Sequence, residues 1–194
     1  MYFYKLVRFL AIIVFNIVFR IDIEGKENIP PEGRLVLCSN HISALDPIIL
    51  AIAIPRPISF MAKKELFKNK ILAKIIYKLG AFPVDRDGSD ISAIRSSLRV
   101  LKEEKVLGIF PEGTRVSRVD LDNVKAGVGL ISIKGKSPVV PVYIQSNYNI
   151  FSKVIVRIGK PIHLDESFDK KLSTEEYRSI SREILQAIYS LNKM

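Results

Sequence analysis

Short apolar runs alternate with longer amphipathic segments along most of this chain, and this alternation restricts the folds that it can adopt. The predicted strands are residues 35–39, 58–61, 81–84, 106–110, 139–144 and 154–158. The predicted helices are residues 47–54, 66–79, 90–104, 128–133 and 174–191. Alternation of this kind predicts an α/β fold, with a mostly parallel or mixed sheet covered by helices on both faces.

Composition narrows the class of protein. With 194 residues, 48% of them hydrophobic, the chain is long enough for one buried core and is most simply a single domain. Its net charge of +10 favours an anionic partner. Trp is absent, and no basic run is interleaved with aromatic residues, so we expect no nucleic acid as partner. The lone Cys38 excludes an internal disulfide.

The N-terminal segment predicts contact with a membrane. Residues 1–20 contain basic but no acidic residues, and the apolar stretch at 9–19 is shorter than the roughly 20 residues of a spanning helix. We expect a helix that lies in the interface, with Tyr2 and Tyr4 near its surface and basic residues such as Arg8 towards lipid head groups. A retained span and a cleaved signal peptide are the alternatives.

One Pro-rich segment offers a boundary within the chain. Residues 27–33 contain Pro30-Pro31, and we expect them to separate the N-terminal helix from the remainder. The predicted organisation is a membrane-associating helix at 1–20 and an α/β domain at 21–194. We expect the protein to be membrane-associated, at the cytoplasmic face.

Three polar clusters follow predicted strands directly. His41, Arg86 and Glu112 each lie just past the carboxyl end of a different strand. In open α/β sheets the ligand crevice lies at this edge, so we expect the three clusters to converge.

His41 and Asp46 form a candidate base and its orienting acid. On a continuous helix, residues five apart point away from each other, but Pro47 disfavours helix at Asp46 and suits the first turn of a helix. We therefore predict that Asp46 is an N-cap and that a turn folds His41 back onto it. A carboxylate on one ring nitrogen leaves the other free to accept a proton. A capping Asp beside a partly buried His is the structural alternative.

The sequence Phe-Pro-Glu-Gly-Thr-Arg at 110–115 is a second candidate element. Gly113 permits close backbone approach to a ligand, and Arg115 offers a planar fork for a phosphate. Glu112 can accept a hydrogen bond from a hydroxyl or orient an Arg. A surface turn with a Glu–Arg pair is the alternative. The segment lacks the Lys of a nucleotide-binding loop.

A basic amphipathic segment lies between these two elements. Lys70, Lys74 and Lys78 share one face at helical spacing. The neighbouring apolar face consists of Ile71, Leu72, Ile75, Ile76 and Leu79. Such a helix can lie on an anionic membrane, or it can pack on the sheet with its Lys face in solvent.

Four sequence blocks resemble those of the 1-acylglycerol-3-phosphate acyltransferase family, within the glycerolipid acyltransferases. Residues 40–46 are similar to its Asn-His-x-Ser-x-x-Asp block, and residues 110–115 match its Phe-Pro-Glu-Gly-Thr-Arg block. Residues 80–86 and 139–142 resemble the remaining two blocks more loosely. The similarity extends over about 23–162.

The resemblance implies direct acyl transfer without a covalent intermediate. His41, oriented by Asp46, would take the proton of a lysophosphatidate hydroxyl, which would attack an acyl thioester of CoA or acyl carrier protein. The implied acceptor-binding residues are Arg86, Glu112, Gly113, Thr114 and Arg115. The resemblance implies no metal and no cofactor beyond the thioester substrate. The motifs leave glycerol 3-phosphate or another lysophospholipid open as acceptor. A basic membrane- or nucleic-acid-binding protein without catalysis is the alternative from a different class.

Overall fold

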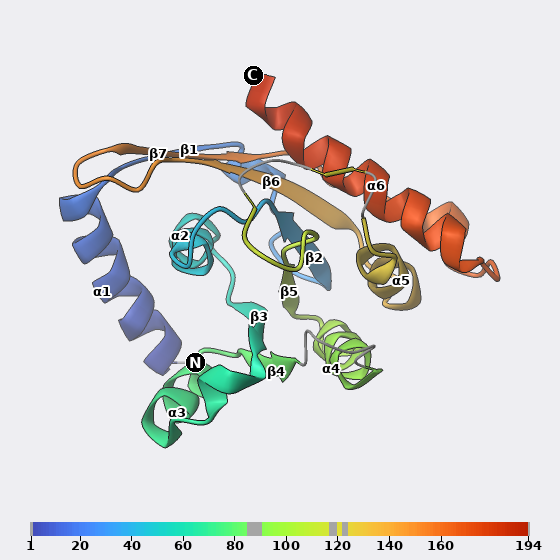
Figure 1. Ribbon diagram of the computed structural model, residues 1–194, viewed down its shortest axis with the longest axis horizontal. Coiled ribbons are helices and arrows are strands. Elements are labelled where there is room, and N and C mark those ends of the chain that lie inside the picture. Colours follow the sequence, from blue (N-terminus) through green and yellow to red (C-terminus); the bar gives the residue numbers. More distant parts are fainter. Residues whose placement is uncertain (1, 85–90, 117–119, 122–123, 194) are drawn as a thin grey trace.

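A single seven-stranded sheet forms the centre of the molecule in the computed structural model, which describes residues 2–84, 91–116, 120–121 and 124–193 (Figure 1). Its strands are β1 (Arg20–Glu24), β2 (Leu35–Ser39), β3 (Ile58–Lys63), β4 (Phe82–Val84), β5 (Val106–Ile109), β6 (Val139–Gln145) and β7 (Lys153–Ile158). They are ordered β1-β7-β6-β2-β5-β3-β4. Neighbouring strands are parallel except β6 and β7, which are antiparallel, so the predicted mixed sheet is confirmed.

Helices cover both faces of this sheet. They are α1 (Tyr2–Val18), α2 (Asp46–Ala53), α3 (Lys70–Lys78), α4 (Ile91–Lys102), α5 (Gly127–Lys134) and α6 (Thr174–Ser190). Helices α1 and α2 lie on one side, and α4, α5 and α6 lie on the other (Figure 1). Each face of the sheet has its own apolar core, and strand β2 contributes side chains to both. Leu35 and Leu37 pack on the α2 side, while Val36 and Cys38 pack on the α5–α6 side. The α/β architecture with two covered faces is therefore confirmed.

The edge strand β1 was not predicted from the sequence. It pairs in parallel with β7, from Arg20 opposite Lys153 to Glu24 opposite Arg157. Strand β1 therefore lies between the N-terminal helix and residues 27–33, and it belongs to the main sheet.

Helix α1 is attached to α2 by Arg8. The Arg8 guanidinium donates to the carbonyls of Ala51 (2.7 Å) and Ile52 (2.9 Å), in the last turn of α2. A cation there satisfies carbonyls that have no partner within the helix and opposes the negative end of its dipole. The expectation that Arg8 faces lipid head groups is therefore wrong. Among the described residues, no helix is both long and apolar enough to cross a membrane.

Helix α3 is shorter than predicted and lies off the sheet. The Asn69 side chain accepts from the backbone N–H groups of Ile71 (3.0 Å) and Leu72 (3.1 Å), so the helix begins at Lys70 rather than at residue 66. None of its residues is buried, and Ile71 is 76% exposed. The alternative in which this helix packs on the sheet is therefore wrong.

Candidate active site

Two loops at the carboxyl ends of neighbouring strands build the site. His41 follows β2 and Glu112 follows β5, and these strands pair in parallel at the centre of the sheet. The backbone N–H of Val116 donates to the carbonyl of His41 at 2.9 Å, which joins the loops directly. The predicted convergence of His41 and Glu112 is confirmed, whereas Arg86 lies outside the described residues.

Asn40 fixes the end of β2 immediately before His41. Its side-chain amide donates to the carbonyl of Ile144 (2.9 Å) and accepts from the N–H of the same residue (2.7 Å). The amide thus continues the hydrogen bonding between β2 and β6 beyond the last backbone pair. This role of Asn40 was not predicted from the sequence.

The carboxylate of Asp46 holds the His41 ring. His41 Nδ1 lies 2.8 Å from Asp46 Oδ2, and the same oxygen accepts from the N–H groups of Ile42 and Ser43, each at 2.7 Å. The predicted turn that folds His41 onto Asp46 is confirmed. The predicted N-cap role is wrong, because the cap residue is Leu45 and the Asp46 carboxylate turns back into the loop instead of bonding to helix N–H groups. Asp46 has no exposed surface.

The His41 imidazole has one nitrogen available for chemistry. Its ring stacks on Phe110, with the centroids 4.1 Å apart and the planes at 20°. Asp46 engages Nδ1, so Nε2 is the nitrogen that can accept a proton, in a ring whose orientation is fixed from two sides.

Glu112 is held by a residue from the far end of the chain. Tyr189, on α6, donates its hydroxyl to Glu112 Oε1 at 2.9 Å. The other oxygen, Oε2, is buried and has no hydrogen-bond partner within the described part of the chain. Burial raises the pKa of the Glu112 carboxyl, while the Tyr189 hydrogen bond and nearby His41 oppose that shift. Nothing in the sequence of α6 distinguishes Tyr189 from the other residues of its apolar face, so its contact with Glu112 could not be predicted.

Three residues that follow Glu112 directly, Gly113, Thr114 and Arg115, lie at the surface. Gly113 has φ +71°, a left-handed conformation that favours glycine, and a Cβ there would meet nothing within 4 Å. Thr114 and Arg115 are exposed. The turn therefore presents an open backbone at Gly113 and the exposed Arg115 to solvent.

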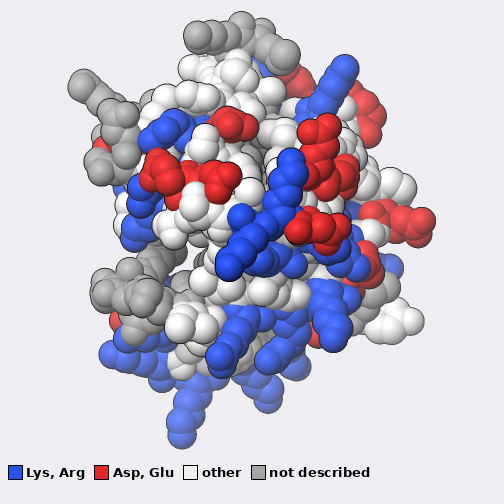
Figure 2. Space-filling model, turned by 90° about the vertical axis from the view of Figure 1, so that its right-hand side faces the viewer, with Lys and Arg blue, Asp and Glu red and all other residues white. Residues whose placement is uncertain are grey.

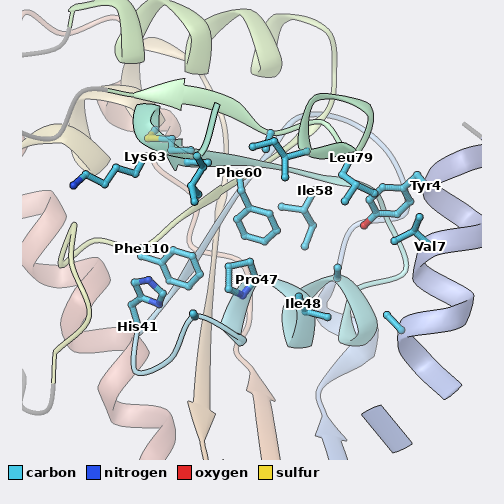
Figure 3. Close-up of a pocket in the computed structure, with 18 of the residues that line it drawn as sticks. Tyr4, Val7, His41, Pro47, Ile48, Ile58, Phe60, Lys63, Leu79 and Phe110 are labelled. Atoms are coloured by element: carbon cyan, nitrogen blue, oxygen red, sulfur yellow. The ribbon is translucent and has the colours of Figure 1, made fainter. Parts of the chain in front are cut away.

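An apolar cavity of about 560 Å³ leads from the His41 ring to the N-terminal helix. His41 and Phe110 lie at one end, and Tyr4 and Val7 of α1 lie at the other, with Phe60 between them (Figure 3). Helices α2 and α3 and strand β3 complete the wall, and Arg115 also lines it. No three His, Cys, Asp or Glu side chains in the described ranges gather closely enough to hold a metal ion.

A buried His–Asp pair at the end of an apolar cavity, beside an exposed Arg, suits transfer between a hydrophobic substrate and an anionic one. The model of the family described as Acyltransferase matches residues 20–145. A protein of Bacillus subtilis named 1-acyl-sn-glycerol-3-phosphate acyltransferase is 36% identical over 90% of this chain and 89% of its own. A Streptococcus pneumoniae protein of the same name is 32% identical over 82% of this chain and 61% of its own.

A solved structure extends the similarity to the fold. The crystal structure of the 1-acyl-sn-glycerophosphate (LPA) acyltransferase PlsC from Thermotoga maritima superposes with a TM-score of 0.77. It is 25% identical, and the match covers 98% of this chain and 80% of that one. The chain therefore belongs to the acyltransferase family, and it is an O-acyltransferase.

Proposed function

We propose that this enzyme transfers a fatty acyl group from a thioester of CoA or acyl carrier protein to the free hydroxyl of 1-acylglycerol-3-phosphate, giving phosphatidic acid for phospholipid synthesis. The contact between His41 and Asp46 carries this proposal, since it supplies an oriented base at the end of an apolar cavity. The names of the relatives support the choice of acceptor.

The chemistry needs two substrates and no further cofactor. His41 Nε2 takes the proton of the acceptor hydroxyl as its oxygen attacks the thioester carbonyl carbon. Asp46 stabilises the resulting imidazolium through Nδ1. The tetrahedral intermediate then collapses, the carbon–sulfur bond breaks, and the imidazolium returns the proton to the departing thiolate. The products are an ester and a free thiol.

The 110–115 segment is proposed to bind the acceptor. Arg115 supplies a bidentate fork for the phosphate, and Arg86 is proposed to assist it. Glu112 Oε2, which has no hydrogen-bond partner among the described residues, can accept a hydrogen bond from an acceptor hydroxyl. Gly113 and Thr114 border the same open surface, where the glycine leaves room for the ligand.

The cavity is proposed to receive the acyl chain of a substrate. Its volume lies within the roughly 300–1,000 Å³ of small-molecule sites, and its apolar wall ends at the base that would act on the reacting group. Because α1 forms part of this wall, the chain would reach the cavity from the end of the molecule that we propose faces lipid.

Helices α1 and α3 are proposed to dock on an anionic membrane, at its cytoplasmic face. Lys78 Nζ lies 5.3 Å from the centroid of the Phe3 ring, so the two helices adjoin. Lys and Arg crowd the lower end of the molecule in Figure 2, the end that α3 occupies in Figure 1. Exposed apolar side chains of α1 include Tyr2, Leu6, Phe9, Leu10, Ile13, Val14 and Ile17. An apolar face beside lysines is typical of interfacial helices.

Thiol release from acyl thioesters tests the proposed reaction. Palmitoyl-CoA and palmitoyl-acyl carrier protein are each offered with lysophosphatidate, glycerol 3-phosphate or lysophosphatidylcholine. We expect release that depends on lysophosphatidate and falls about 10²–10⁴-fold in His41→Ala. Greater turnover with either other acceptor would overturn the assignment of acceptor, and turnover by folded His41→Ala would overturn the mechanism.

Kinetics of Arg115 variants test the proposed phosphate site. Arg115→Ala should raise KM for lysophosphatidate more than KM for the thioester. Arg115→Lys should recover only part of the loss, because an ammonium cannot form the bidentate pair. A defect confined to the thioester KM would assign Arg115 to the donor instead.

Matched replacements of exposed isoleucines test the membrane surface. Ile17 on α1 is 68% exposed, Ile71 on α3 is 76% exposed, and Ile91 on α4, across the sheet, is 61% exposed. Each is changed to Ser, and sedimentation with phosphatidylglycerol vesicles is measured. Burial of one such side chain contributes about 1.5–3 kcal/mol, so Ile17→Ser and Ile71→Ser should weaken binding at least tenfold. Equal binding by all three variants would place the docking surface elsewhere.

A further inference from the structure

Tyr148 makes a contact with the candidate catalytic pair that none of the sequence motifs includes. It lies between β6 and β7, and its hydroxyl donates to Asp46 Oδ1 at 2.6 Å. Asp46 Oδ2 is the oxygen that holds His41 and two backbone N–H groups. The two carboxylate oxygens therefore bind different partners: Oδ2 contacts the His41 loop, and Oδ1 accepts from Tyr148.

We propose that Tyr148 is a positioning residue, which locks the Asp46 carboxylate so that His41 keeps the orientation needed for acyl transfer. This inference rests on the proposed function of His41. The terminal torsion of an Asp side chain is broad, so a carboxylate held through one oxygen can rotate about its Cβ–Cγ bond. A donor on the second oxygen fixes the plane of the group and with it the direction of the Nδ1 contact.

The Tyr148 hydroxyl is suited to act only as a donor. Burial, followed by the charge of Asp46 and the hydrogen bond to it, raises the pKa of Tyr148 above its ordinary value. The phenol therefore stays protonated throughout the pH range in which the enzyme works. A hydrogen bond from such a donor to a buried carboxylate belongs to the stronger class.

The fold holds the Tyr148 ring in place through the end of α1. The Phe19 ring meets it edge-on, with centroids 5.8 Å apart and planes at 85°. The N–H of Tyr148 donates to Ser146 Oγ at 3.0 Å, and the N–H of Phe151 donates to the carbonyl of Val18 at 2.7 Å. Tyr148 has φ +55°, a left-handed conformation that non-glycine residues rarely adopt. Such strain persists where surrounding contacts over-determine it.

Tyr148→Phe removes the hydroxyl and keeps the ring against Phe19. We expect kcat to fall about tenfold, the scale set by loss of one hydrogen bond to a charged group. Neither KM should change, since Tyr148 is not among the described residues that line the cavity. Tyr177→Phe, at a buried tyrosine of α6 away from the site, is the matched control and should retain kcat.

A double-mutant cycle separates positioning from general packing. In an Asp46→Asn background, Tyr148→Phe should lower kcat less than threefold, because the carboxylate that it positions is gone. A full tenfold loss in that background, or a rise in either KM, would assign Tyr148 a structural role. His41→Ala is assayed in parallel. Inactive His41→Ala together with unchanged kcat in folded Tyr148→Phe would overturn this inference alone, whereas active His41→Ala would overturn the proposed function itself.

Discussion

Replacing Asn40 by Ala should lower the free energy of unfolding by about 2–6 kcal/mol and disturb the loop that carries His41. The side-chain amide of Asn40 makes two hydrogen bonds with Ile144, one through the carbonyl and one through the N–H, and Asn40 is 1% exposed. Ile144 is also 1% exposed, so water cannot replace the lost amide without rearrangement. Each buried group left without a partner costs about 1–3 kcal/mol, and two such groups give the estimate.

A second variant and a control sharpen this prediction. Asn40→Asp should be at least as destabilising as Asn40→Ala, because a carboxylate can accept from the Ile144 N–H but cannot donate to its carbonyl. Asn28 makes a single amide contact with the carbonyl of Ile158 (2.8 Å) at a partly buried site. Asn28→Ala should therefore cost only about 0.5–1.5 kcal/mol.

Urea unfolding followed by far-ultraviolet circular dichroism measures these differences. The midpoint should move while the slope with urea stays constant, as expected when stability alone changes. Acyl-transfer activity should fall further in Asn40→Ala than in Asn28→Ala when both are assayed at a temperature where both are folded. A loss below about 1 kcal/mol in Asn40→Ala would refute the argument that this amide completes the hydrogen bonding of the sheet.

Three further predictions concern other parts of the site. Folding raises the pKa of the Glu112 carboxyl above its usual 4.5, so the folded protein binds this proton more tightly than the unfolded chain does. The stabilisation that the bound proton provides is present below pH 4.5 and is lost as the pH rises through the folded-state pKa. The unfolding free energy of wild type minus that of Glu112→Gln should therefore decline from pH 4.5 upwards, and a difference that is flat with pH in urea titrations would contradict this. Gly113→Ala should cost about 1–2 kcal/mol in urea unfolding from left-handed strain, whereas Gly127→Ala, at an equally open helical position, should not destabilise; equal effects would remove the backbone argument. Arg8→Met should lose about 1–2 kcal/mol and release α1 to limited proteolysis, while an unchanged cleavage rate would mean that other contacts hold this helix.

The local motifs could be predicted because their partners lie a few residues apart. His41 and Asp46 are five positions apart, and the turn before Pro47 brings their side chains within reach of each other. Ser173 and Glu176, three positions apart, form a capping box at the start of α6 that depends on the same short spacing.

Some differences from the prediction had signals in the sequence. Strand β1 has apolar residues at 21 and 23 between polar neighbours, the alternation of a half-buried edge strand, but it directly follows the apolar N-terminal helix. Asn69 is a favourable cap that marks the start of α3 four residues after the predicted one.

What the sequence determined by itself is the alternation of strands and helices and the two motifs at the ends of β2 and β5, since these depend on apolar periodicity and on neighbours along the chain. What only the tertiary structure decided is which distant residues complete the site. Tyr148 reaches Asp46 across 102 positions, and Tyr189 reaches Glu112 across 77. A tyrosine in a loop or on an amphipathic helix has no pattern that names its partner. The order of the strands brings these residues together, and that order is set by packing of the whole sheet rather than by local sequence.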